Sequence, residues 1–128
     1  MQKKISFPVE MLSKPEGYTT EKVAEFMTTV APKMIKLFVE KDTDYNGSFA
    51  NRGMISATLN LERKMDRVNS LFYSGRIADD SPSENIVDTY IDLANYALMN
   101  LWALGELSPA VKSQIEEFIN PDELKDVE

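Results

Sequence analysis

The chain of 128 residues contains no cysteine and no histidine. These two absences exclude disulfides, zinc sites built on thiolates, cysteine nucleophiles and every mechanism that uses a histidine base. The side chains left for chemistry are those of Asp, Glu, Lys, Arg, Tyr, Ser and Thr, and carboxylate oxygens suit hard cations such as magnesium or manganese. No apolar run reaches the roughly 18 residues of a membrane span, and the N-terminus lacks a signal-peptide core. We therefore expect a soluble cytoplasmic protein with no membrane partner.

Positive charge is also scarce: the chain has 14 Lys and Arg residues and 21 Asp and Glu residues, which gives a net charge of −7. This balance disfavours nucleic acid as a polymeric partner. It is compatible with small phosphorylated ligands, since a bound metal reverses the local sign. The length and the apolar content of 43% fit one domain over residues 1–128. We expect its core at residues 20–105, an extended arm at 1–18 and an acidic tail at 120–128.

Apolar periodicity predicts an all-α bundle of four to five helices. The first helix begins at Thr20, and Pro32 should kink it or divide it into two short helices. Residues 41–53, with the turn signal Asn46-Gly47, are expected to form a loop. The third helix should be capped by Ser81 and stopped by Gly105. The remaining helices are expected at residues 54–73 and 109–119.

Polar side chains interrupt the third expected helix, which is otherwise almost entirely apolar. Glu84, Asp88, Asp92 and Asn95 fall within a sector of roughly 80° at about 100° per residue. A carboxylate on a mostly buried helix face is costly unless a cation, a base or hydrogen-bond donors meet it. Something should therefore lie opposite this polar row.

The second expected helix carries a row with the same spacing, formed by Glu62, Asp66 and Asn69. If the two helices pair antiparallel, Asp66 comes level with Asp88 and Glu62 with Asp92. Four facing carboxylates cannot all stay ionised without a partner, and one or two divalent cations would satisfy them. The alternative is a solvated acidic face that forms ordinary ion pairs with Arg63, Lys64 and Arg67.

Basic and aromatic residues near these rows are candidates for ligand binding. Lys64, Arg67, Arg52 and Arg76 are placed to hold phosphate groups or to balance the acids, with a plain surface charge as the favoured interpretation of Arg76. Tyr45 stands in a polar turn with Asn46 and Ser48 and is a candidate to stack on a base or sugar. Tyr96 is either a second such platform or part of the core.

Three segments resemble the nucleotide-modification-associated domain family of phages and their hosts. They are Asp42-Thr-Asp-Tyr-Asn-x-Ser-Phe49, Lys64-x-x-Arg-Val-x-x-Leu71 and Ser83-Glu-x-x-x-Asp-Thr-x-x-Asp-Leu-Ala-Asn-Tyr-Ala97. The resemblance covers about residues 20–105. It implies a MazG-like fold, because that family in turn looks like the all-α NTP pyrophosphatases, which include MazG and the dimeric dUTPases. It also implies host cytoplasm as the location if a phage encodes the chain.

The pyrophosphatase resemblance implies a magnesium-dependent (or manganese-dependent) nucleotide site. Those enzymes hold the metal with two acidic pairs and release pyrophosphate from a nucleoside triphosphate. By resemblance, Glu62 and Asp66 match the first pair, and Glu84 and Asp88 the second. Both pairs here are spaced i, i+4 instead of i, i+3, which favours binding over hydrolysis.

Three functional hypotheses follow. The first is a metal-dependent pyrophosphatase in which Asp92 is the base or an outer ligand and Lys64 and Arg67 neutralise phosphate charge. Its substrate would lie beside Tyr45, Asn46, Ser48, Arg52, Asn95 and Tyr96. The second is a nucleotide-sequestering protein without turnover. The third is a structural protein whose acidic row pairs with another subunit. In every case the apolar density of the helices predicts a homo-oligomer, and the resemblance to the pyrophosphatases implies a dimer or a tetramer.

Overall fold

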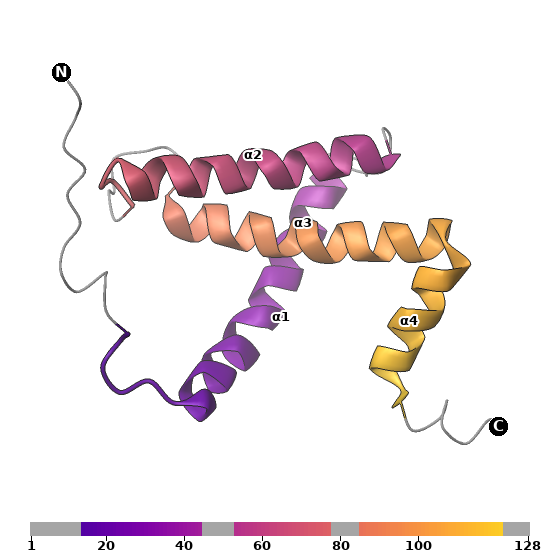
Figure 1. Cartoon of the computed structure of the whole chain (residues 1–128), viewed down its shortest axis with the longest axis horizontal. Helices are drawn as coiled ribbons and strands as arrows, with labels where there is room; N and C mark the ends of the chain where they lie inside the picture. Colours follow the sequence, from indigo (N-terminus) through magenta and orange to yellow (C-terminus); the bar gives the residue numbers. More distant parts are fainter. Residues whose placement is uncertain (1–13, 45–52, 78–84, 122–128) are drawn as a thin grey trace.

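The computed structural model describes residues 14–44, 53–77 and 85–121, and these residues form four helices. The helices are α1 (Thr20–Asp44), α2 (Gly53–Tyr73), α3 (Ile86–Leu107) and α4 (Pro109–Ile119), as Figure 1 shows. No strand occurs in the described part of the chain. The predicted all-α class is confirmed. The predicted arm up to residue 13 and the tail from residue 122 lie outside the described residues.

Helix α1 is longer than its apolar pattern predicts. It begins at Thr20, where the backbone N–H of Lys22 donates to the Oγ1 of Thr19 at 3.1 Å. It then continues through Pro32 to Asp44 as a single helix, so the alternative of two short helices is wrong. Residues 41–44 are therefore helical and not part of a loop, because the backbone bonds of α1 persist for one more turn than the apolar residues do.

The end of α2 follows the prediction closely. Gly75 adopts a left-handed φ of +74°, which costs a glycine nothing. Its N–H donates to the carbonyl of Phe72 at 3.1 Å, and the N–H of Arg76 donates to the carbonyl of Leu71 at 2.8 Å. This pair of bonds satisfies carbonyls that the helix end leaves without a partner.

The boundaries of α3 differ from the prediction at both ends. The cap is Asn85 and not Ser81: the Asn85 side chain accepts from the backbone N–H of Asp88 at 2.9 Å. The helix also passes through Gly105 to Leu107. Gly105 is buried, and a Cβ there would lie 2.9 Å from the Cδ1 of Ile115. The glycine thus permits close packing of α4 instead of stopping α3, and Ser108 caps α4 as predicted.

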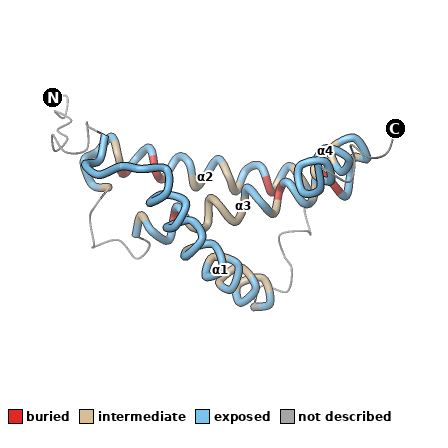
Figure 2. Tube along the Cα trace, turned by 90° about the horizontal axis from the view of Figure 1, so that it is seen from below, coloured by how far each residue is buried: buried red, intermediate tan, exposed pale blue. Residues whose placement is uncertain are grey.

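Helices α2 and α3 lie side by side and antiparallel, as Figures 1 and 2 show. The buried residues lie on these two helices, and the apolar ones among them are Ala57, Val68 and Leu71. Two polar contacts fix the register. Asn100 donates to the carbonyl of Ala57 at 3.3 Å, and Arg67 donates to Thr89 at 3.2 Å.

The other two helices extend from this pair and leave an open shape. Helix α1 crosses α3 obliquely, and α4 turns away from the end of α3 (Figure 1). Large apolar side chains on all four helices are exposed. None of the described helices is both long enough and apolar enough to cross a membrane.

Candidate functional site

Asp92 lies where α1, α2 and α3 meet, and both of its carboxylate oxygens are engaged. The Nζ of Lys41 on α1 is 2.8 Å from Oδ1, and the Nζ of Lys64 on α2 is 3.1 Å from Oδ2. The side chains of Asp92, Lys64 and Lys41 are 14%, 20% and 44% exposed, respectively. We call these three residues the Asp92 cluster. The polar row is expected to have a partner opposite it, and at Asp92 this partner is a pair of ammonium groups of the same chain.

The electrostatics of the Asp92 cluster favour the charged form of Lys41. The hydrogen bond to Asp92 raises the pKa of Lys41 above its ordinary value of 10.5, although partial burial and the charge of Lys64 act in the opposite direction. The hypothesis of an acidic row paired with another subunit does not apply to Asp92, since its ion pairs lie within its own chain.

Asn95, the next member of the row, also faces α1. Its Nδ2 donates to the carbonyl of Met34 at 3.1 Å. Tyr96 is half-buried beside it in the sequence. The other predicted substrate-binding residues lie outside the described residues; they are Tyr45, Asn46, Ser48 and Arg52.

A second set of contacts fixes Arg67. Its Nε donates to the Oγ1 of Thr89 at 3.2 Å, and that hydroxyl donates to the carbonyl of Asn85 at 3.1 Å. Thr89 is fully buried. The cap at the start of α3 and the middle of α2 are thereby joined through one threonine.

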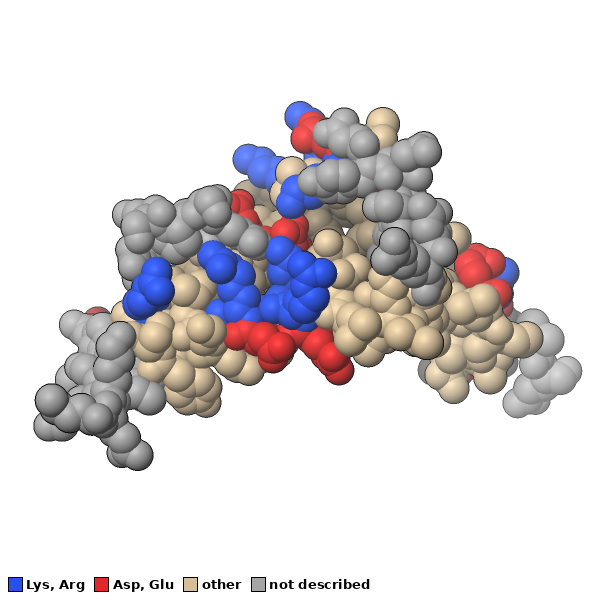
Figure 3. Space-filling view, turned by 90° about the horizontal axis from the view of Figure 1, so that it is seen from above, with Lys and Arg blue, Asp and Glu red and all other residues tan. Residues whose placement is uncertain are grey.

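An open hollow of about 390 Å³ lies beside Arg67, lined by Asp66, Arg67, Ser70, Leu71 and Arg76. We call it the arginine hollow. Two guanidinium groups and a hydroxyl are the donor types that proteins use for phosphate. Figure 3 shows Lys and Arg side chains gathered on this side of the molecule, bordered by Asp and Glu. The hollow therefore has the chemistry of an anion site next to carboxylates.

The predicted metal ligands are only partly brought together. Glu62 and Asp66 are exposed on α2, and Asp88 is exposed in the first turn of α3, where its Oδ2 accepts weakly from the N–H of Asn85 at 3.4 Å. Glu84 lies outside the described residues. Among the residues that are described, no group of three or more carboxylates is placed to hold a metal ion. The predicted magnesium site stays a prediction.

The register of α2 and α3 accounts for part of this result. The prediction set Glu62 level with Asp92, whereas the structure sets Lys64 there. A shift of two residues turns the facing group from a carboxylate into an ammonium. The antiparallel pairing was predictable from helix lengths, but the register depends on side-chain contacts that periodicity does not report.

Three residues of the site are missed by the sequence reasoning: Lys41, Ser70 and Thr89. Lys41 was assigned to a loop, yet it continues the half-buried face of α1 at helical spacing from Met34 and Phe38. Extending the period by one turn would have found it. Thr89 was noted only as part of a motif, and a threonine has no periodicity signal that marks it as buried.

The comparison with protein families gives one match. Residues 41–104 match the family described as nucleotide modification associated domain 1, and these residues are half of the chain. The chain belongs to this family. The match spans the last turn of α1, all of α2 and most of α3, which contain the Asp92 cluster and the arginine hollow. Neither the curated proteins nor the solved structures gave a match.

Proposed function

We propose that this member of the nucleotide modification associated domain 1 family binds a nucleoside polyphosphate at the arginine hollow and acts on it as a magnesium-dependent pyrophosphohydrolase. The observation that carries the proposal is the hollow itself, in which Arg67, Arg76 and Ser70 stand beside Asp66. It lies in the segment that matches a family named for nucleotide modification.

The phosphates would contact the two arginines. Arg67 is held by its Nε bond to Thr89, so its position is set before a ligand arrives. Preorganised donors contribute more to binding than mobile ones because less side-chain entropy is lost. Lys64, held by Asp92 at 3.1 Å, supplies a further positive charge on the same helix.

Magnesium fits this donor set when it arrives with the nucleotide. The ion usually takes one or two protein carboxylates together with substrate phosphates, and Asp66, Glu62, Asp88 and Glu84 are the candidates. Bound there, it would neutralise phosphate charge and activate the attacking water. Hydrolysis would add water to the α-phosphorus, break its bond to the bridging oxygen of the β-phosphate, and release a nucleoside monophosphate and pyrophosphate.

Asp92 has a different role in this proposal from the one that its sequence position predicted. Both carboxylate oxygens contact lysines, so we assign it to positioning Lys64 and not to orienting water. Its replacement should raise the KM for the nucleotide more than it lowers kcat.

The second candidate function is sequestering of a nucleotide without turnover. The engagement of Asp92 by two lysines favours it, because that carboxylate is then not available as a base. Binding of a nucleotide with no release of pyrophosphate would select this function.

The test compares two arginines of the full chain. Isothermal titration with a panel of deoxynucleoside triphosphates, with and without magnesium, should give binding that Arg76→Gln weakens by about tenfold, the loss of one charged contact of about 1.4 kcal/mol. Arg63→Gln removes the same charge from α2 at an exposed position that does not line the hollow. It should change affinity by less than about twofold.

Release of pyrophosphate is measured in the same samples. Turnover that requires magnesium supports hydrolysis. The absence of nucleotide binding by the wild type in every condition would refute the proposal, and so would an equal effect of Arg63→Gln and Arg76→Gln.

A further inference from the structure

The bend between α3 and α4 carries an apolar surface that the rest of the described chain does not cover. Leu98, Leu101 and Trp102 follow one another at i, i+3 and i+4 along α3. Ile115 lines the same hollow from α4, and Phe118 lies one turn further along α4. We call these five residues the elbow surface. Trp102 is 62% exposed and Phe118 is 86% exposed.

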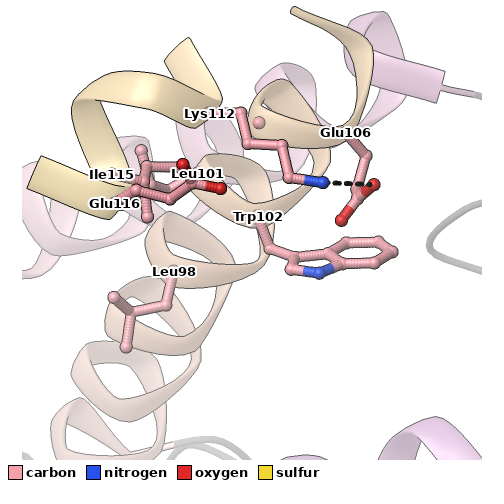
Figure 4. A pocket seen from close by; sticks show the side chains of 8 residues that line it. Leu98, Leu101, Trp102, Glu106, Lys112, Ile115 and Glu116 are labelled. Carbon is pink, nitrogen blue, oxygen red and sulfur yellow. Dashed lines mark ion pairs between the residues drawn. The ribbon is translucent and has the colours of Figure 1, made fainter. Parts of the chain in front are cut away.

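The elbow surface is hollowed. A depression of about 240 Å³ is lined by Leu98, Leu101, Trp102 and Ile115, with charged residues at its edge. Figure 4 shows the indole of Trp102 below the ion pair between Lys112 and Glu106. The Nζ of Lys112 lies 4.0 Å from the Oε2 of Glu106. An apolar centre with a charged rim is the usual composition of a protein interface.

The exposed apolar area of the elbow surface is large enough for a pair of chains. Leu98, Leu101, Trp102 and Phe118 are 60%, 44%, 62% and 86% exposed. At about 200 Å² for each large residue, their exposed parts amount to about 500 Å² on one chain. Two facing copies would therefore bury about 1,000 Å² of apolar surface, near the lower limit of a specific interface.

The core of a single chain is correspondingly small. Among the described residues only Ala57, Val68 and Leu71 are buried apolar residues. Burial of further apolar surface against a partner would help to offset the conformational entropy of about 1 to 2 kcal/mol for each ordered residue. A second copy is the one partner that is always made with the chain.

The charges at the edge of the elbow surface also suit a second copy. Glu106, Glu116 and Lys112 place both signs around the same hollow. In an interface with twofold symmetry, the same surface of both copies forms the contact, in opposite orientations. Lys112 of one copy can therefore contact the acidic residues of the other. We propose that two copies of this chain associate through their elbow surfaces, which lie partly beyond the segment that matches the family.

The test uses one exposed position on α4. Phe118→Asp places a charge where a lone chain already exposes the side chain, so the fold of an isolated chain should not change. If the elbow surfaces pair, the substitution buries a charge in the interface. Ser113→Asp is the matched control, because it adds the same charge to α4 about 140° away around the helix.

Light scattering after gel filtration measures the outcome. The wild type should have a mass of at least about 29 kDa, twice the 14.5 kDa chain. Phe118→Asp should halve this mass without loss of helicity in circular dichroism, while Ser113→Asp should change neither. A helical wild type of 14.5 kDa at micromolar concentration would overturn the proposal, as would a Phe118→Asp variant with unchanged mass.

The single tryptophan of the chain provides a second readout that needs no variant. Dilution of the wild type should move the emission of Trp102 to longer wavelength and increase its quenching by acrylamide several-fold, because the indole becomes exposed. Emission that does not change while the mass falls would place the interface elsewhere and contradict the elbow surface.

Discussion

Replacing Asp92 by asparagine tests the Asp92 cluster most directly. The substitution keeps the shape of the side chain but removes the charge that two lysines contact at 2.8 and 3.1 Å. The ammonium groups of Lys41 and Lys64 then face each other. They lie no more than about 8 Å apart, and at an effective dielectric constant of about 20 they repel by about 2 kcal/mol.

We expect Asp92→Asn to lower the free energy of unfolding by about 2 kcal/mol. This value lies between the small loss of stability expected for an exposed ion pair and the loss of about 3–5 kcal/mol expected for a fully buried one. The intermediate value fits an aspartate that is 14% exposed with one lysine that is 44% exposed. Urea denaturation followed by circular dichroism measures it, at one fixed protein concentration because association also affects stability.

The control substitution is Glu62→Gln, which removes a charge from an exposed carboxylate on α2. It should change stability by less than about 0.5 kcal/mol. The double variant Asp92→Asn with Lys41→Gln removes the repulsion, so it should be more stable than Asp92→Asn alone. An Asp92→Asn protein as stable as the wild type would refute the reasoning.

The pH dependence provides an independent check of the same cluster. Hydrogen bonding to Asp92 raises the pKa of folded Lys41 above 10.5. The resulting stability is fully present below pH 10.5 and is lost as the pH rises through the folded pKa. The difference in unfolding free energy between wild type and Asp92→Asn should therefore shrink above pH 10.5.

Substitutions at two further positions test the start of α3 and its pairing with α2. Asn85→Ala removes the cap that accepts from Asp88 at 2.9 Å, and thermal denaturation should show a loss of about 1 kcal/mol, with Asn85→Asp as the control that keeps an acceptor. Asn100 is buried, and its Oδ1 has no hydrogen-bond partner among the described residues. Asn100→Asp should cost about 3 kcal/mol because it buries a charge, whereas Asn100→Leu should cost less because it removes one hydrogen bond together with an oxygen that has no partner; the opposite order in urea denaturation would contradict this reasoning.

The helices could be predicted from the sequence better than the contacts between them. Apolar spacing and end signals located α2 and α4 almost to the residue, because those signals are local. Asn85, Gly105 and Lys41 were assigned differently from the structure, since each acts through a neighbour. Asn85 caps α3 through the backbone of Asp88, Gly105 permits the close approach of Ile115, and Lys41 contacts Asp92 on another helix.

The contacts at Thr89 link the start of α3 to the proposed ligand site. The hydroxyl of Thr89 donates to the carbonyl of Asn85 and accepts from the Nε of Arg67. A phosphate bound to Arg67 would reduce the mobility of that guanidinium and so strengthen the bond to Thr89. Since the same threonine is bonded to the capping residue, nucleotide binding should also protect the first turn of α3 from hydrogen exchange. Ligand binding and the folding of α3 would then be coupled through a residue that the ligand need not touch.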